Sequence, residues 1–272
     1  GGFSDVKLTL TTDYGGNLDD YMNKGELSRL ISYVDSIYCQ FGGADRKVYG
    51  DEHLEELHAL KRKAAAADLA FIPARIRHLG TDVNSEILSH MRDSLPNNVT
   101  VIAKTPVDTI LADKDGSVLG IVAGGETYHC KYLVSAPGRD GAEWFAGEAK
   151  RLGLKTKSNA VDIGVRVEPP AEIYEPSTDL CYESKLVYFS EDFDDRVRTF
   201  CMNPYGFVVT ENNNGLMTVN GHSYANKKSQ NTNFAILVSK QFTEPFHEPI
   251  EYGKYIASLA NMLGGGPIVQ RL

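Results

Sequence analysis

The chain has 272 residues, with 28 Lys and Arg against 36 Asp and Glu, so its formal net charge is −8. Hydrophobic residues make up 42% and charged residues 24%, which is ordinary for a soluble globular protein and argues against a disordered tail or a collagen-like repeat. No apolar run approaches the ~20 residues of a membrane span. The acidic balance, without Lys/Arg clusters, argues against a general nucleic-acid binder. We expect neither a membrane nor a nucleic acid as partner.

The cysteines and histidines argue against a disulfide-rich protein and against a metal-binding protein. Four scattered cysteines do not form a disulfide framework or a CxxC site, and the seven histidines show neither H-x-x-x-H nor HExxH spacing. We therefore predict no metal site and a cytoplasmic location. The chain begins at Gly1 without a Met or a signal peptide and ends at Leu272 just after a glycine-rich turn. Both ends are expected to be cuts from something longer.

The first hundred residues predict helices separated by short strands. Apolar residues at spacings of three and four indicate helices over 25–42 and 52–68, and 69–72 is expected to be a short buried strand. Thr81 or Asp82 is expected to cap a third helix, and 99–102 predicts another strand.

A three-stranded antiparallel meander is predicted next. The runs 105–113, 117–123 and 126–135 alternate in hydrophobicity and are separated by Asp-Gly and Gly-Gly turns. The end of the last run, 132–135, is apolar enough to be buried on both faces. It leads into Ala136-Pro137-Gly138 and then a helix containing Trp144.

After about residue 155 the pattern becomes that of an antiparallel sheet. Short β-type runs separated by turn residues are followed by a last helix near 252–263. The runs are 161–167, 185–189, 197–202, 207–210 and 216–220.

The order helix, strand, meander, buried strand and then Ala-Pro-Gly resembles the FAD-binding domain of two-dinucleotide-fold flavoproteins. Narrower matches resemble the uncharacterised FAD-dependent dehydrogenase family, relatives of the HI0933-like NAD(P)/FAD-dependent oxidoreductases. One departure is Val6, where that family is expected to have Gly. The matching segments are GGFSDVKL (1–8), HLGTD (78–82), VSAPGRDGA (134–142), CMNPYGF (201–207), VNGHS (219–223) and LGGGPIVQRL (263–272).

The resemblance implies FAD as the cofactor, carried by an oxidoreductase, and leaves NAD(P)H open as the electron donor. Such proteins begin with a strand–GxGxxG–helix unit that holds the pyrophosphate, and no segment here matches it. The chain is therefore interpreted as an internal fragment, inactive and without FAD by itself. Its partners would be a small-molecule substrate and the remainder of its own polypeptide.

The expected fold class is α/β plus α+β. A partial Rossmann-like FAD-binding domain with the meander would cover 1–150, and a mainly antiparallel β substrate domain would cover 151–262. Residues 263–272 would return toward the FAD-binding domain. The expected cofactor-binding residues are Gly2, Phe3, Ser4, Asp5, Val107, Ala136, Pro137, Gly138, Arg139, Gly265 and Gly266.

Several of these residues have a second interpretation. Ala136, Pro137 and Gly138 also suit an ordinary strand end and turn, and Arg139 could either donate to the flavin or pyrophosphate or pair with a nearby acid. Asn203 and Tyr205 are expected either to line the substrate cavity or only to form a β-turn.

Only one candidate acid or base stands out. His222 follows a strand end and could exchange a proton with a substrate, or it could be structural; otherwise the catalytic residues are unknown. A second hypothesis is a self-contained, non-catalytic ligand-binding module.

Overall fold

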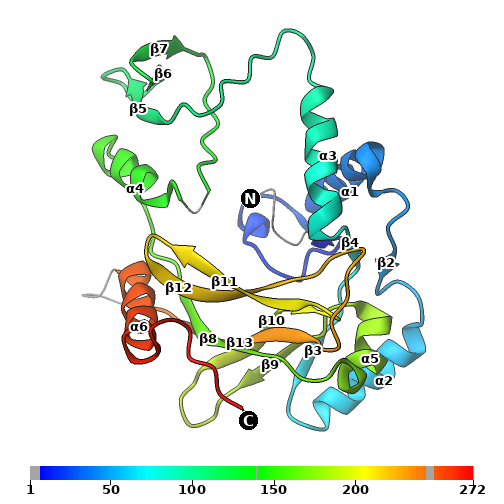
Figure 1. The fold of residues 1–272 in the computed structure, drawn as a ribbon. Coiled ribbons are helices and arrows are strands. Elements are labelled where there is room, and N and C mark those ends of the chain that lie inside the picture. Colours follow the sequence, from blue (N-terminus) through cyan, green and yellow to red (C-terminus); the bar gives the residue numbers. More distant parts are fainter. Residues whose placement is uncertain (1–6, 139, 243–247, 272) are drawn as a thin grey trace. The chain divides into compact units, whose positions relative to one another are not determined.

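The computed structural model describes residues 7–138, 140–242 and 248–271 (Figure 1). The chain divides into two compact units. The main unit comprises the described residues of 1–94 and 159–272, and the meander unit comprises 95–158. This division differs from the functional boundary expected at residue 150, because the first 94 residues fold with the second half. The functional division stays a prediction.

The main unit is built on a five-stranded sheet in which all neighbouring strands are antiparallel. The predicted antiparallel character of the second half is thus confirmed, with strands at 161–167 and 185–189 as expected. The sheet also contains a strand near its centre, β13, that the sequence did not predict. In sheet order the strands are β3 (Ala70–Ile72), β9 (Lys185–Phe189), β10 (Arg196–Asn203), β13 (Asn233–Lys240) and β8 (Val161–Val167).

Two helices cover the β3 end of this sheet (Figure 1). The predicted helix α2 (Leu54–Ala65) buries Leu57 against Phe71 of β3. Helix α5 (Ala171–Cys181) completes this core with Cys181. Sequence patterning missed α5 because Pro176, which lacks a backbone N–H donor, lies inside it.

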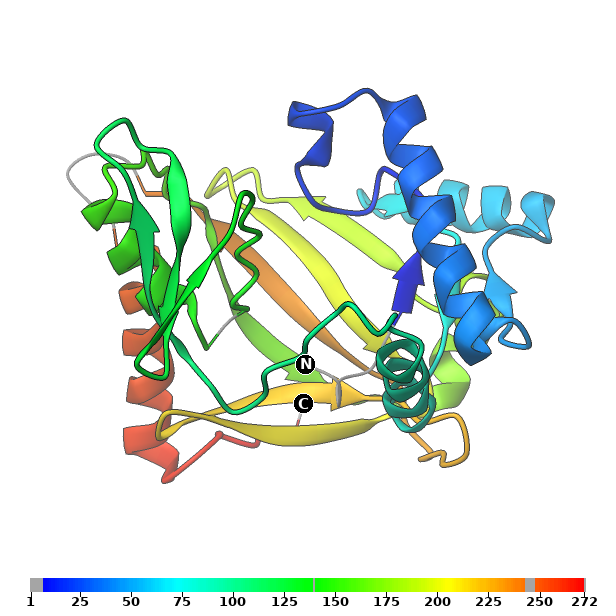
Figure 2. The same ribbon diagram turned by 90° about the horizontal axis from the view of Figure 1, so that it is seen from above.

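A smaller antiparallel sheet carries one side of the site described below. It consists of β1 (Lys7–Thr9), β4 (Ile76–His78) and β2 (Val48–Tyr49), with β4 in the middle. Helices α1 (Lys24–Tyr38) and α3 (Thr81–Asp93), both predicted, lie beside it (Figure 2).

One ion pair ties the small sheet to α1. Arg77 of β4 donates two hydrogen bonds to the carboxylate of Asp35, at 2.7 and 2.9 Å. Both side chains are largely buried, at 11% and 17% exposure, and this fork geometry is the strongest form of the Arg–carboxylate pair.

The remaining elements of the main unit are a hairpin and the last helix. Strands β11 (Phe207–Asn213) and β12 (Leu216–His222) form the hairpin, and α6 (Pro249–Gly264) packs against β12 and β8. Asn261 of α6 exchanges two hydrogen bonds with the backbone of Met217, at 2.7 and 2.8 Å, which fixes the helix on the hairpin.

The meander unit confirms the predicted three antiparallel strands and the helix containing Trp144. The strands are β5 (Val107–Ala112), β6 (Val118–Ala123) and β7 (Glu126–His129), and the helix is α4 (Ala142–Arg151).

Two predicted strands of this unit are wrong. Residues 99–102 and 132–135 are not strands, and Val101 and Val134 are 61% and 90% exposed. An apolar run becomes a buried strand only when a neighbouring strand pairs with it, and no strand among the described residues does so. The described residues therefore form a mixed α/β fold with several antiparallel sheets, without the expected Rossmann-like parallel sheet.

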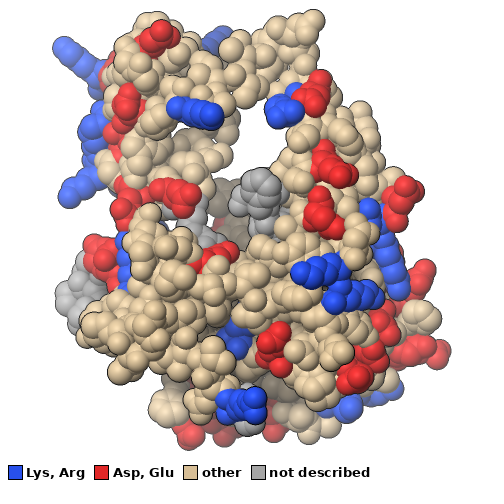
Figure 3. All heavy atoms as spheres, viewed as in Figure 1, with Lys and Arg blue, Asp and Glu red and all other residues tan. Residues whose placement is uncertain are grey.

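The surface carries charges of both signs. Figure 3 shows acidic and basic side chains interspersed over the face in view. Within the described ranges, no helix is long and apolar enough to cross a membrane.

Glu148 locks α4 onto the meander. Its carboxylate accepts hydrogen bonds from the Arg151 guanidinium at 2.6 Å, from the Ile110 backbone N–H at 2.7 Å and from the Thr109 hydroxyl at 2.9 Å. The Arg151 bond is the largest influence, and together these donors lower the pKa of Glu148 from 4.5 to about 2.

We predict that the meander unit loses stability in acid. The pKa of Glu148 is lower in the folded state than in the unfolded state, so its ionised carboxylate stabilises the fold. This stabilisation is complete above pH 4.5 and is lost as the pH falls toward 2. Glu148→Gln should lower the melting temperature at pH 7 and abolish most of this acid dependence. Fluorescence of Trp144, the chain's single tryptophan, would follow unfolding, with the exposed Glu126→Gln as control. An unchanged acid dependence in Glu148→Gln would contradict the prediction.

Candidate functional site

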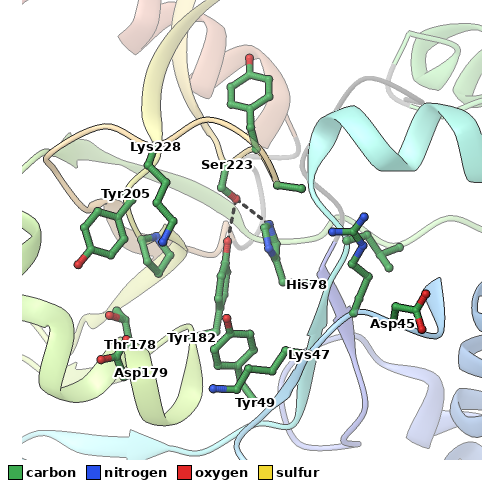
Figure 4. Close-up of a pocket in the computed structure, with 15 residues that line it drawn as sticks. Asp45, Lys47, Tyr49, His78, Thr178, Asp179, Tyr182, Tyr205, Ser223 and Lys228 are labelled. Carbon is green, nitrogen blue, oxygen red and sulfur yellow. Dashed lines mark hydrogen bonds between the residues drawn. The ribbon is translucent and has the colours of Figure 1, made fainter. Parts of the chain in front are cut away.

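A cavity of about 260 Å³ lies within the main unit (Figure 4). Five chain segments meet around it: the stretch into β2, the end of β4, the end of α5, the turn after β10 and the loop after β12. Its walls combine tyrosine rings with a histidine, a serine and charged side chains. This mixture of aromatic surface and a few converging polar groups is typical of a small-molecule site.

Tyr182 enters this cavity from a strained turn. It directly follows α5 with φ 57° and ψ −50°, and the Glu183 N–H donates to the Cys181 carbonyl at 2.5 Å. This three-residue γ-turn with positive φ is rare and strained for a residue that has a Cβ. Backbone strain of this kind costs about 1–3 kcal/mol and persists only where the surroundings hold it.

The surroundings of Tyr182 explain why the turn is held. Its ring stacks on His78 with centroids 4.4 Å apart and packs on Tyr49 at 5.1 Å. Its hydroxyl lies 2.8 Å from Ser223 Oγ, and His78 Nε2 lies 2.9 Å from the same atom. Figure 4 shows both hydrogen bonds converging on Ser223. Tyr182 and Ser223 are only 5% and 2% exposed.

The N-terminus of α3 positions Ser223. The Thr81 backbone N–H and its hydroxyl both donate to the Ser223 carbonyl at 3.2 Å, and Asp82 accepts from the Ala225 N–H at 3.0 Å. Burial by itself would raise the pKa of Asp82, but backbone donors led by Ala225 outweigh it and lower that pKa. The predicted capping role of Thr81 or Asp82 is wrong. Gly80 stands at the cap, and both side chains hold the Ser223 loop instead.

The three polar groups form a directional chain. A serine hydroxyl has one proton to donate and can also accept. When Ser223 donates to His78 Nε2, the Tyr182 hydroxyl donates to Ser223, and reversing the histidine tautomer reverses the chain. The arrangement can therefore relay a proton between its two ends, and an imidazole is a side chain suited to proton exchange.

A buried ion pair lies beside this chain. Lys7 Nζ is 2.9 Å from Glu183 Oε2 and donates to the Met202 carbonyl at 2.7 Å, with both charged side chains nearly buried. The same ammonium lies 5.9 Å from the centre of the Tyr182 ring. Burial and the neighbouring Glu183 carboxylate raise the pKa of Tyr14. A buried ion pair, in which each charge has a partner, therefore supports the polar chain from one side.

Tyr205 is the predicted substrate-cavity residue that does line the cavity. Its hydroxyl donates to Glu175, and this bond raises the pKa of Tyr205 to about 12. The Lys228 ammonium lies 4.7 Å from the centre of its ring.

The other two substrate candidates lie elsewhere. Asn203 is fully buried, donates to the Cys201 carbonyl at 2.9 Å and lies 3.3 Å from the Asn233 amide oxygen. His222 ends β12, with its ring 6.3 Å from that of Tyr224. Neither belongs to the cavity lining. Their functional roles stay predictions.

The expected cofactor residues are not gathered in this cavity. Val107, Ala136, Pro137 and Gly138 belong to the meander unit, where the last three are exposed. Gly265 ends α6 with φ 66°, and Gly266 follows it. The remaining expected cofactor residues lie outside the described residues: Gly2, Phe3, Ser4, Asp5 and Arg139.

Sequence reasoning did not single out His78, Tyr182 or Ser223 as functional residues. His78 and Ser223 belong to the segments HLGTD and VNGHS that carried the family resemblance, so a signal for them was present. Tyr182 lay in no such segment. Its conformation depends on packing that no local pattern encodes.

Comparisons with known proteins point toward flavoproteins. Residues 161–267 match the family model described as "FAD-dependent protein, C-terminal domain-like". A protein of Clostridium beijerinckii named "Uncharacterized protein" is 29% identical over 218 residues, which cover 71% of this chain. The match covers 40% of that relative, so the chain spans about two fifths of its length. These findings support a relation to FAD-dependent proteins.

We predict that Tyr182→Phe destabilises the main unit. The variant keeps the ring on His78 but removes one hydrogen bond from buried Ser223, which costs about 0.5–1.5 kcal/mol of unfolding free energy. Tyr188→Phe is the matched control, since Tyr188 is 41% exposed, and should change stability by less than about 0.5 kcal/mol. Urea unfolding followed by circular dichroism would measure both. Equal midpoints for the two variants would contradict the prediction.

Proposed function

We propose that this chain is part of an FAD-dependent oxidoreductase and that its main unit holds the substrate. The observation that carries the proposal is the match of residues 161–267 to an FAD-dependent family. Tyr182, Tyr205 and Ser223 of the cavity lie in that matched stretch. The flavin, when bound, would supply the electron transfer.

The size of the cavity favours a substrate over the cofactor. Pockets for drug-sized ligands measure about 300–1,000 Å³, and this one, at about 260 Å³, is smaller. An FAD molecule, with two nucleotide halves, needs more room. The cavity suits a molecule of metabolite size, with tyrosine rings against its apolar part.

The Tyr182–Ser223–His78 chain supplies the proton exchange that redox of a small molecule requires. Dehydrogenation removes two hydrogens from a substrate: one leaves with its bonding electron pair, which the flavin would accept, and the other leaves an O–H, N–H or C–H bond as a proton. We propose that the Tyr182 hydroxyl accepts that proton as it gives its own to Ser223 Oγ, and that Ser223 in turn gives its proton to His78 Nε2, which holds it. The stacked ring of Tyr182 keeps His78 in place during the exchange.

The loop Ala136–Pro137–Gly138 is our proposed contact for part of FAD. Gly138 has φ 70°, and a Cβ built there would meet no atom within 4 Å, so the exposed backbone leaves room for a ligand. Such close backbone approach is the usual reason for glycine at a dinucleotide site. NAD(P)H as electron donor and the cytoplasmic location stay predictions from the sequence.

The first test is the flavin content of the parent protein. We expect the purified full-length gene product to show flavin absorbance near that of free FAD. We expect reduction of this flavin to become slower in Ser223→Ala, because the proton chain is broken, with flavin content unchanged. A colourless full-length protein that still binds small molecules would instead support the non-catalytic ligand-binding module and overturn the proposal.

We also predict that Gly138→Val in the full-length protein lowers FAD occupancy. The control is Gly153→Val, because Gly153 has nearly the same φ, 69°, and equally open space. The two variants therefore bear the same backbone strain, and only position 138 is expected to affect the cofactor. The ratio of flavin to protein absorbance measures occupancy. Equal occupancy in both variants would remove Gly138 from the site.

A further inference from the structure

The cavity carries unpaired positive charge. We propose that Arg46, assisted by Lys47 and Lys228, binds the carboxylate of a small organic acid and thereby defines the substrate class of the site. This inference rests on the proposed function in one respect, that the cavity is the substrate site. Its starting observation is that these three cationic side chains line the cavity of a chain with net charge −8.

Several cations elsewhere in the chain pair with carboxylates, whereas within the described residues none of these three forms an ion pair. Arg77 pairs with Asp35, and Arg198 pairs with Asp162. In the described parts of the chain, no hydrogen bond or ion pair engages the guanidinium of Arg46, and its Nε is buried without a partner. A guanidinium has five N–H donors, and one that makes no hydrogen bond within the described residues keeps donors for a ligand in the cavity it lines.

The backbone of Arg46 is held firmly in place. The Arg77 guanidinium donates to the Arg46 carbonyl at 2.9 Å, and the Arg46 N–H donates to the Gly43 carbonyl at 3.1 Å. The Arg77–Asp35 pair therefore anchors the turn that presents Arg46 to the cavity. A guanidinium presented in this way binds a carboxylate through two parallel hydrogen bonds.

The two lysines add charge at the ends of the cavity. Lys47 Nζ lies 4.5 Å from the centre of the Tyr49 ring, and Lys228 Nζ lies 4.7 Å from that of Tyr205. Both are exposed, and so are the two acidic lining residues, Asp45 and Asp179. The exposed charges nearly balance, which leaves half-buried Arg46 as the net positive centre of the cavity.

The rest of the wall decides between an organic acid and an inorganic anion. The rings of Tyr49 and Tyr182 pack together beside the cavity, and Leu79 and Pro204 also line it. An inorganic phosphate would leave this apolar surface uncovered, whereas the carbon skeleton of an organic acid would cover it. We therefore assign the cavity to a small carboxylate with an apolar body.

The test is calorimetric titration of the 272-residue chain at low ionic strength. The probes are benzoate and succinate, their neutral amides benzamide and succinamide, and inorganic phosphate. We expect at least one carboxylate to bind about tenfold or more tightly than its own amide and than phosphate. We expect Arg46→Gln to weaken that binding about tenfold or more, because a charge-assisted bond is lost.

Two further variants make the result decisive. Arg46→Lys keeps the charge and should retain more affinity than Arg46→Gln, while the exposed Arg29→Gln on α1 should bind like the unaltered chain. Circular dichroism would establish that each variant is folded. If neither carboxylate binds better than its amide, or if Arg29→Gln weakens binding as much as Arg46→Gln, the inference is overturned.

The outcomes also separate this inference from the proposed function. A parent protein that contains flavin, with no preference of the cavity for carboxylates, overturns the substrate class alone. Preferential carboxylate binding in a parent protein without flavin overturns the oxidoreductase proposal alone.

Discussion

The γ-turn at Tyr182 is the constraint on which the site depends. It turns the chain sharply between α5 and β9 and places one tyrosine ring where three parts of the main unit meet. The ring packs with Ala74 and Ile76 in a small core, stacks on His78 and reaches Ser223 with its hydroxyl. These contacts offset a backbone conformation that costs about 1–3 kcal/mol. The strained backbone at Tyr182 therefore lies at the point where the hydrogen bonds among Tyr182, Ser223 and His78 require a fixed geometry.

The charges around the site are organised in two layers. Beside Tyr182, Lys7 and Glu183 form a nearly buried ion pair. Such a pair requires good geometry because removing charges from water is costly. Along the cavity, Arg46 has no carboxylate partner in the described residues, and its backbone is fixed through Arg77. The charges of Lys7 and Glu183 neutralise each other, whereas the charge of Arg46 remains for a ligand in the cavity. A binding site for an anion requires such a charge.

Local patterns predicted elements best where a single periodicity applied. The meander and helices α1 to α3 formed close to their predicted ranges, because each pattern is satisfied within its own segment or its hairpin neighbour. The strand 161–167 was also predicted, although its partner β13 lies about 70 residues further along the chain. The runs 99–102 and 132–135 failed because a buried strand also needs a distant partner. Helix α5 was not predicted because Pro176 lies inside it, and a proline inside a helix is locally unfavourable. The helix forms nevertheless, with Cys181 at its end buried in the core.

The sequence by itself determined the acidic character, the meander, the antiparallel second half and the resemblance to FAD-dependent proteins, which one family match supports. It also contained His78 and Ser223 within the matching segments. Only the tertiary structure decided that these two residues meet at Tyr182 and that Arg46 faces the same cavity. The reason is physical: Ser223 lies 145 positions from His78 and 41 from Tyr182, and strand pairing and core packing, not local propensity, bring the three residues together.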